Sequence, residues 1–336
     1  MSSAAEPNGE VRSLRARAIG ATVGFAIGMA LLVAAAWVLY RQRGEMEQAW
    51  HSVRYACPWL LALAVLLPLL NWALISLSFW ILMRRHGTIG AVEMGAAIGG
   101  AWLLNYLPLR AGMIGRVAYH KTVNGIGVRD CVRVMVTGLA LGGVSVGLLL
   151  LIVAALASFE SWWLWGGVLA SPLLLAAGTW GVTLRGRPDR APQNANARPR
   201  DGLNAYAAVL AIRYLDLLVW TARYAVVFAL VGAPIGLPGA VAFAAVCQVA
   251  LVVPFIGNGL GVREWAIGLT AAALPAGVLG SDMGAGVGLL ADLVNRAAEV
   301  LVVIPVGIAS VALLSRRMRR SGAVDRVRQV VAEMRK

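Results

Sequence analysis

The sequence is poor in charged residues. Asp, Glu, Lys and Arg make up 14% of its 336 residues, whereas soluble domains carry about 25%. Hydrophobic residues make up 60%, and the mean hydropathy is +0.75. This balance excludes an ordinary soluble protein and indicates an all-α polytopic membrane protein.

Long polar segments are also missing. The longest stretch between apolar runs, residues 184–203, is too short for a soluble domain, which needs roughly 50 residues or more. We therefore expect no separate catalytic domain.

Cysteine and histidine are scarce, with three of each. The cysteines are odd in number and lack CxxC spacing, which argues against a disulfide framework or a zinc site. The histidines lie in separate loops without the spacing of metal ligands. No P-loop or dinucleotide-binding glycine motif is present, so we expect no cofactor. These residues are Cys57, Cys131, Cys247, His51, His86 and His120.

Acidic residues are outnumbered by basic ones, 16 to 30, which gives a net charge of +14. The basic residues form short clusters beside apolar runs, as the positive-inside bias of membrane proteins requires. This pattern favours membrane topology over a nucleic-acid partner as the reason for the charge.

Six apolar runs are long enough to cross a bilayer, which takes about 20 helical residues. We expect residues 1–18 to form a cytoplasmic N-terminal segment, residues 19–315 the membrane domain, and residues 316–336 a basic cytoplasmic tail. A basic linker, residues 185–202, would join two halves of the domain. The expected spans are residues 19–40, 57–83, 134–159, 162–184, 203–231 and 287–314.

Two further apolar stretches are interrupted by glycine, proline and arginine, at residues 105–116 and 254–264. Non-helical backbone at membrane depth is tolerated only where it is buried in protein or lines a wet cavity. Ionisable residues at that depth are rare and usually functional. We therefore interpret the two stretches as the halves of a substrate site.

Charge distribution suggests how these stretches insert. If each forms a re-entrant hairpin, one from the cytoplasm and one from outside, then 21 of the 30 Lys and Arg residues are cytoplasmic and 3 are external. This agrees with the positive-inside rule and puts both termini in the cytoplasm. Oppositely oriented interrupted segments point to a transporter-type site at the midplane. A possible inverted repeat pairs Pro108, Gly112 and Arg116 with Pro254, Gly259 and Arg263.

The motifs at residues 105–116 and 259–264, with the Asn295-Arg296 pair, resemble the flippase-like membrane domain. That domain also forms the transmembrane region of lysylphosphatidylglycerol synthases. The resemblance covers residues 20–315. It implies a bacterial or archaeal inner-membrane protein that moves or handles phospholipid or polyprenyl-phosphate lipids. Since no polar segment of the sequence is long enough for a soluble domain, we expect no aminoacyl-transferase domain of the kind found in the bifunctional synthases.

The arginines of the motifs are candidate phosphate ligands, since guanidinium forms bidentate charge-assisted bonds to phosphate. The glycines would let backbone N–H groups approach the anion. Glu264 would either hold Arg263 in place or serve as a proton-coupling group. The candidate substrate-binding residues are Asn105, Pro108, Arg110, Gly112, Arg116, Asn258, Gly259, Gly261, Arg263, Glu264 and Arg296.

Other charged residues are spaced for ion pairs within helices. Such pairs either serve the substrate path or only hold helices together. A mid-helix asparagine, Asn71, is expected to bond between helices. The ion-pair candidates are Asp292, Arg296 and Glu299, and Arg213 with Asp216.

The leading hypothesis is a protein that binds an anionic phospholipid or polyprenyl-phosphate lipid and flips it across the inner membrane. One alternative is an enzyme, or enzyme subunit, of polyprenyl-phosphate glycolipid or hopanoid synthesis. Another is a structural partner of a lipid-synthesis enzyme. No nucleic-acid partner is expected.

Overall fold

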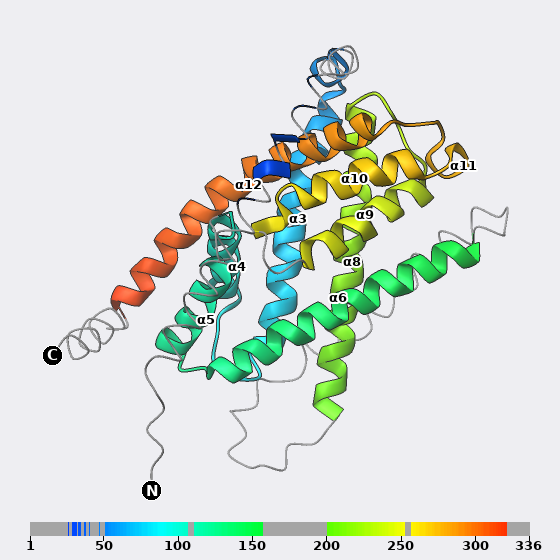
Figure 1. The fold of residues 1–336 in the computed structure, drawn as a ribbon. Coiled ribbons are helices and arrows are strands. Elements are labelled where there is room, and N and C mark those ends of the chain that lie inside the picture. Colours follow the sequence, from blue (N-terminus) through cyan, green and yellow to red (C-terminus); the bar gives the residue numbers. More distant parts are fainter. Residues whose placement is uncertain are drawn as a thin grey trace, which may run out of the picture.

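The computed structural model describes residues 51–106, 111–156, 200–252 and 257–320, with scattered positions between 26 and 47. Within these ranges all regular secondary structure is helical (Figure 1). The elements are α3 (Pro58–Met83), α4 (Ala91–Leu104), α5 (Ala111–Val123), α6 (Val128–Leu156), α8 (Arg200–Leu230), α9 (Leu237–Val252), η2 (Gly257–Gly259), α10 (Val262–Ala273), α11 (Ala276–Leu279) and α12 (Ala285–Arg320).

Four of these helices are long and apolar enough to cross a membrane, which confirms the prediction of a helical membrane protein. They match four of the six expected spans. The other two, together with the linker and both terminal segments, fall mostly or wholly outside the described residues. The four helices are Pro58–Met83, Val128–Ala155, Asn204–Leu230 and Ala285–Arg320.

The longest helix, α12, is the axis on which the shorter ones pack (Figure 1). α4 lies along its C-terminal half, where Gly99 fits beside Val306 and Gly307 fits against Leu103. α10 lies along its N-terminal half, where Gly288 meets Ala271. Glycines at these contacts allow the close backbone approach typical of membrane helix pairs. α4 therefore packs along the C-terminal half of α12, and α10 packs along the N-terminal half.

At one end of the molecule a buried carboxylate, Glu93 at the start of α4, bonds to residues of two other helices. It accepts hydrogen bonds from the Tyr119 hydroxyl at 2.8 Å and the Asn124 amide at 2.9 Å, near the end of α5. It also pairs with Arg317, near the end of α12. Thus α4 starts, and α5 and α12 end, at the same place.

Three more helices, α3, α6 and α8, begin or finish at the same place. His86, just after α3, lies 3.6 Å from Asp130 at the start of α6. Arg85 lies over the ring of Tyr206, early in α8. We call this the basic end, because of its exposed or partly exposed cations. They are Arg84, Arg85, Lys121, Arg129, Arg133, Arg316, Arg317, Arg319 and Arg320.

The α9–α10 pair opens toward the opposite end of the molecule. α8 begins at the basic end and finishes at the opposite end, where the chain turns into α9. There the backbone N–H of Gly236 donates to the carbonyl of Leu279 at the end of α11. The start of α9 and the segment after α10 therefore lie together. The α4–α5 and α9–α10 pairs open toward opposite ends.

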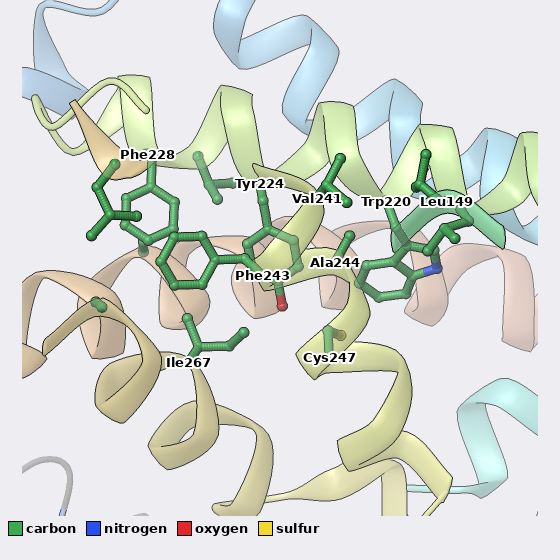
Figure 2. Packing of buried hydrophobic residues seen from close by; sticks show 14 of the residues in the cluster. Leu149, Trp220, Tyr224, Phe228, Val241, Phe243, Ala244, Cys247 and Ile267 are labelled. Carbon is green, nitrogen blue, oxygen red and sulfur yellow. The ribbon is translucent and has the colours of Figure 1, made fainter. Parts of the chain in front are cut away.

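An aromatic cluster fills the space between α8, α9 and α10 (Figure 2). Phe228 and Phe243 stack with their ring centroids 4.5 Å apart, and Tyr224 lies 6.0 Å from Phe243. Each such ring removes a large apolar area from solvent or lipid. The cluster fixes α9 against α8, and it positions the buried hydroxyl of Tyr224 for the polar network described below.

Candidate functional site

Both expected helix interruptions are present. α4 ends at Leu104 and is followed by a turn at residues 105–106, before α5 begins at Ala111. α9 ends at Val252, and a single 3-10 turn at residues 257–259 precedes α10. Pro108 and Arg110 lie outside the described residues, so their predicted roles stay predictions.

The second interruption depends on residues that accept positive φ. Asn258 has φ +51°, Gly259 +65° and Gly261 +79°. Residues with a Cβ atom other than Asn and Asp rarely adopt this conformation, and glycine adopts it at no steric cost. The Gly-Asn-Gly-Leu-Gly sequence thus builds the turn that starts α10.

The first interruption depends on a close approach instead. A Cβ atom at Gly112 would collide with the backbone carbonyl of Ala101, whereas one at Gly115 would meet no atom within 4 Å. The missing side chain at position 112 lets α5 fold back against α4.

The two interruptions meet at the middle of α12. The hydroxyl of Tyr106, just after α4, donates to Glu299 at 3.4 Å and lies close to the side chain of Asn258. Arg296 Nη2 donates to the backbone carbonyl of Asn258 at 3.4 Å. One turn of α12, from Arg296 to Glu299, therefore contacts both.

Arg263 is fully buried and held by two carboxylates of α12. Its Nε donates to Asp292 at 2.9 Å and its Nη1 to Glu299 at 3.0 Å. We expected Glu264 to be one possible holder of Arg263, and the structure shows a different pairing. Adjacent helical residues point in different directions, and Glu264 instead forms an ion pair with Arg296.

The network continues from Glu299 into α8 and α3. Arg223 donates to Glu299 at 3.2 Å, to Asn295 at 2.8 Å and to Asn71 at 3.1 Å. Asn71 in turn donates to the Asp216 carboxylate at 2.7 Å. The interhelical bond expected of Asn71 is confirmed, and Arg223 connects α3 and α8 to the middle of α12.

Two further bonds complete the network. Arg213 pairs with Asp216 at 3.0 Å, as the i, i+3 spacing predicted. The Tyr224 hydroxyl donates to Asp292 at 2.9 Å. Tyr106 and Tyr224 were not among the predicted site residues. Tyr106 lies within the motif at residues 105–116, whereas the only signal at Tyr224 was a polar group in an apolar helix, which does not identify its partner.

The charges of the network balance. Each arginine faces at least one carboxylate, so the network as a whole has no net charge when all groups are ionised. Unpaired buried ions would cost several kcal/mol each, and pairing with additional hydrogen bonds offsets that cost. Its four arginines are Arg213, Arg223, Arg263 and Arg296, and its four acids are Asp216, Glu264, Asp292 and Glu299.

Some buried polar atoms near the interruptions have no hydrogen-bond partner among the described residues. Three are donors, Arg263 Nη2, Arg296 Nη1 and Asn258 Nδ2. Two are acceptors, Asn105 Oδ1 and Glu264 Oε2, while Arg296 Nε and Glu264 Oε1 face each other as an ion pair. Buried polar groups are rarely left unpaired. The three donors where the interruptions meet fit a ligand that supplies acceptor oxygens.

Arg116 is not part of this network. It is partly buried, its guanidinium lies 4.4 Å from the centre of the Phe79 ring, and it lies near Cys131. No ion pair with a carboxylate is found for it among the described residues. The structure thus brings together Asn258, Arg263, Glu264 and Arg296 of the predicted site, with Gly259 and Gly261 in the turn beside them. Asn105 lies at the end of α4, next to Tyr106. It places Arg116 against α3 and α6.

Among the described residues there is no group of three or more His, Cys, Asp or Glu side chains that could hold a metal ion. Comparisons of the chain with protein-family models, curated proteins and solved structures gave no significant match.

Proposed function

We propose that this protein binds a phospholipid or polyprenyl-phosphate lipid with an anionic headgroup and moves it between the leaflets of a bacterial inner membrane. The proposal keeps the resemblance to the flippase-like membrane domain, which rests on the motifs at residues 105–116 and 259–264 and on Asn295-Arg296. The buried polar network at those motifs supports it.

The observation that carries the proposal is the position of the unpaired donors. Arg263, Arg296 and Asn258 present them where both helix interruptions meet α12. A phosphate in low dielectric needs such fixed donors, because moving an unpaired ion out of water costs many kcal/mol. Guanidinium groups supply them with the geometry that phosphate oxygens accept.

The proposed topology follows from the basic end. Its cations would face the cytoplasm by the positive-inside rule. The α4–α5 pair would then be a hairpin that enters from the cytoplasm and returns, since Glu93 joins its two ends. The 14 residues of α4 are fewer than the ~20 that a full span needs. The α9–α10 pair would enter from outside.

Arg296 gives the sharpest test of the site. Lysine at position 296 keeps the positive charge beside Glu264 but loses the planar fork of donors. One charge-assisted hydrogen bond is worth about 1.5–3 kcal/mol, so we expect R296K to slow lipid movement by roughly tenfold or more. The matched control is R129K, at the exposed Arg129 of the basic end.

The measurement uses purified protein in phosphatidylcholine vesicles with a trace of fluorescent phosphatidylglycerol. Dithionite quenching reports how much labelled lipid has changed leaflet, and mass spectrometry reports any covalent change. Movement of unaltered lipid supports a transporter. Covalent modification would favour the enzyme alternative, and equal rates for R296K and wild type would refute the site.

A further inference from the structure

Charge balance restricts how an anion can enter the buried network. Among the described residues four arginines face four carboxylates there, and with all of them ionised an added headgroup of charge −1 would leave these groups with an uncompensated negative charge. Uncompensated buried charge is strongly unfavourable, and buried groups usually neutralise by changing protonation instead. Protonation of one carboxylate would restore neutrality.

The four carboxylates are not held equally. Glu299 accepts from both Arg223 and Arg263. Asp292 is paired with Arg263 and accepts from the Tyr224 hydroxyl. If one arginine moved away to bind a ligand, each of these two acids would still have another hydrogen-bonded side chain.

Asp216 is paired with Arg213 and also accepts a hydrogen bond from Asn71. Arg213 lies on α8 and Asn71 on α3, away from the interruptions. Glu264 differs from all three. Among the described residues its one side-chain partner is Arg296, and the side chain is completely buried. It is the one carboxylate of the four that has no second side chain to hold it.

That single cation lies at the proposed headgroup site. Arg296 contacts Glu264 on one side and the Asn258 carbonyl on the other, and its Nη1 has no partner among the described residues. A phosphate bound by Arg296 and Asn258 would share the guanidinium with Glu264. The negative charge brought by the lipid would therefore act most strongly on Glu264.

The remaining charged and titratable groups around Glu264 do not replace Arg296. α12 contributes Asp292, which is another carboxylate, and α10 contributes Arg263, which is already bonded to two carboxylates. From α9, Cys247 faces Arg263 and Asp292, and from α8, Tyr224 bonds to Asp292. Tyr106 lies toward Glu299 and Asn258.

We propose that Glu264 binds a proton whenever a lipid of net charge −1 binds, so that the protein carries lipid and proton together. This inference rests on the proposed function. The proton comes from water on the side where the lipid enters and adds to a carboxylate oxygen of Glu264. It returns to water on the other side when the lipid leaves and Arg296 pairs with Glu264 again.

The first test uses the wild-type protein, so no variant has to fold. Short-chain dihexanoyl phosphatidylglycerol is added to protein in detergent and weak buffer, with a pH-indicator dye, and binding is followed by calorimetry. We expect uptake of about one proton per bound lipid by linkage. Dihexanoyl phosphatidylethanolamine, whose headgroup has no net charge, should bind without proton uptake.

Binding of phosphatidylglycerol without proton uptake would overturn the inference and leave the proposed function standing. Failure of phosphatidylglycerol to bind or to move in vesicles would overturn both.

The second test assigns the proton to its residue. In vesicles, a proton gradient that drives protons in the same direction as the lipid should accelerate wild-type transport. This acceleration should be absent from E264Q. The control is D282N, since Asp282 is exposed in the turn before α12. An E264Q protein that is folded by size-exclusion chromatography and still responds to the gradient would show that Glu264 is not the proton carrier.

Discussion

The two interrupted helix pairs share a sequence pattern but place their arginines in opposite environments. In α9–α10, Arg263 is fully buried and bonded to two carboxylates of α12. In α4–α5, Arg116 is partly buried and lies over the ring of Phe79. The common pattern of proline, glycine and arginine therefore specifies the backbone interruption, while the neighbouring helices decide what the arginine binds.

The backbone devices differ as well. The α9–α10 turn needs positive φ at three positions, whereas the α4–α5 turn needs the absence of a side chain at Gly112. If the two pairs derive from an inverted repeat, only the interruption itself is retained. Three changes test how different the pairs are.

The largest effect is expected from E299A. Glu299 joins Arg263 of one pair to Tyr106 of the other, and it also holds Arg223. Removing one partner of a buried ion pair costs about 3–5 kcal/mol, so E299A should lower the free energy of unfolding by that amount. Unfolding in mixed micelles with increasing dodecyl sulfate measures it.

The control for E299A is D130A, because Asp130 forms an ion pair with Arg133 at the exposed basic end. Exposed ion pairs contribute about 0–1 kcal/mol. Equal losses in the two variants would contradict the description of the network as buried.

A smaller effect is expected from G112A, which acts on α4–α5 alone. The added methyl group would collide with the Ala101 carbonyl, and overpacking of this kind costs about 1–3 kcal/mol. G115A is the matched variant, because position 115 is open and alanine is a better helix former than glycine by about 1 kcal/mol. Thermal unfolding should therefore rank G115A at or above wild type and G112A below it.

The smallest loss of stability is expected from R116A. A cation over an aromatic ring contributes from about 0.5 kcal/mol at an exposed site to about 2 kcal/mol when desolvated, so for the partly buried Arg116 the unfolding free energy should fall by about 0.5–2 kcal/mol. Lipid movement, in contrast, should be abolished if Arg116 is a substrate ligand, as its motif predicts. Wild-type transport by R116A would restrict the site to the α9–α10 side of the molecule.

Sequence reasoning placed the long helices well, because about 20 apolar residues in a row have few alternatives. Residues 57–83 and 203–231 were expected as spans, and α3 and α8 match them closely. The ends were less accurate. α12 continues to Arg320, six residues past the expected end, since hydropathy marks the edge of the apolar run and not the last helical turn.

Other boundaries depended on local chemistry. α10 ends at Ala273 although the sequence stays apolar beyond it, since Leu274 precedes Pro275 and is extended. α6 begins at Val128, six residues before the apolar run, with Asp130 in its first turn, where an acidic side chain is favourable.

The site was predicted in its location more than in its bonds. Glycine and proline in apolar sequence identified both interruptions, because such residues are costly there. The partners of Arg263 could not be predicted in the same way, because Asp292 and Glu299 are distant in sequence and their approach depends on how α10 packs on α12. The choice between Glu264 and these two acids is a tertiary effect.

The shared turn of α12 has a mechanical consequence. Arg296 contacts the turn before α10, and Glu299 contacts the residue that follows α4. Both lie within about one helical turn, or 5.4 Å of axial rise. A shift or rotation of α12 by part of a turn would therefore alter both sets of contacts at once, so a movement of this one helix reaches both helix pairs together.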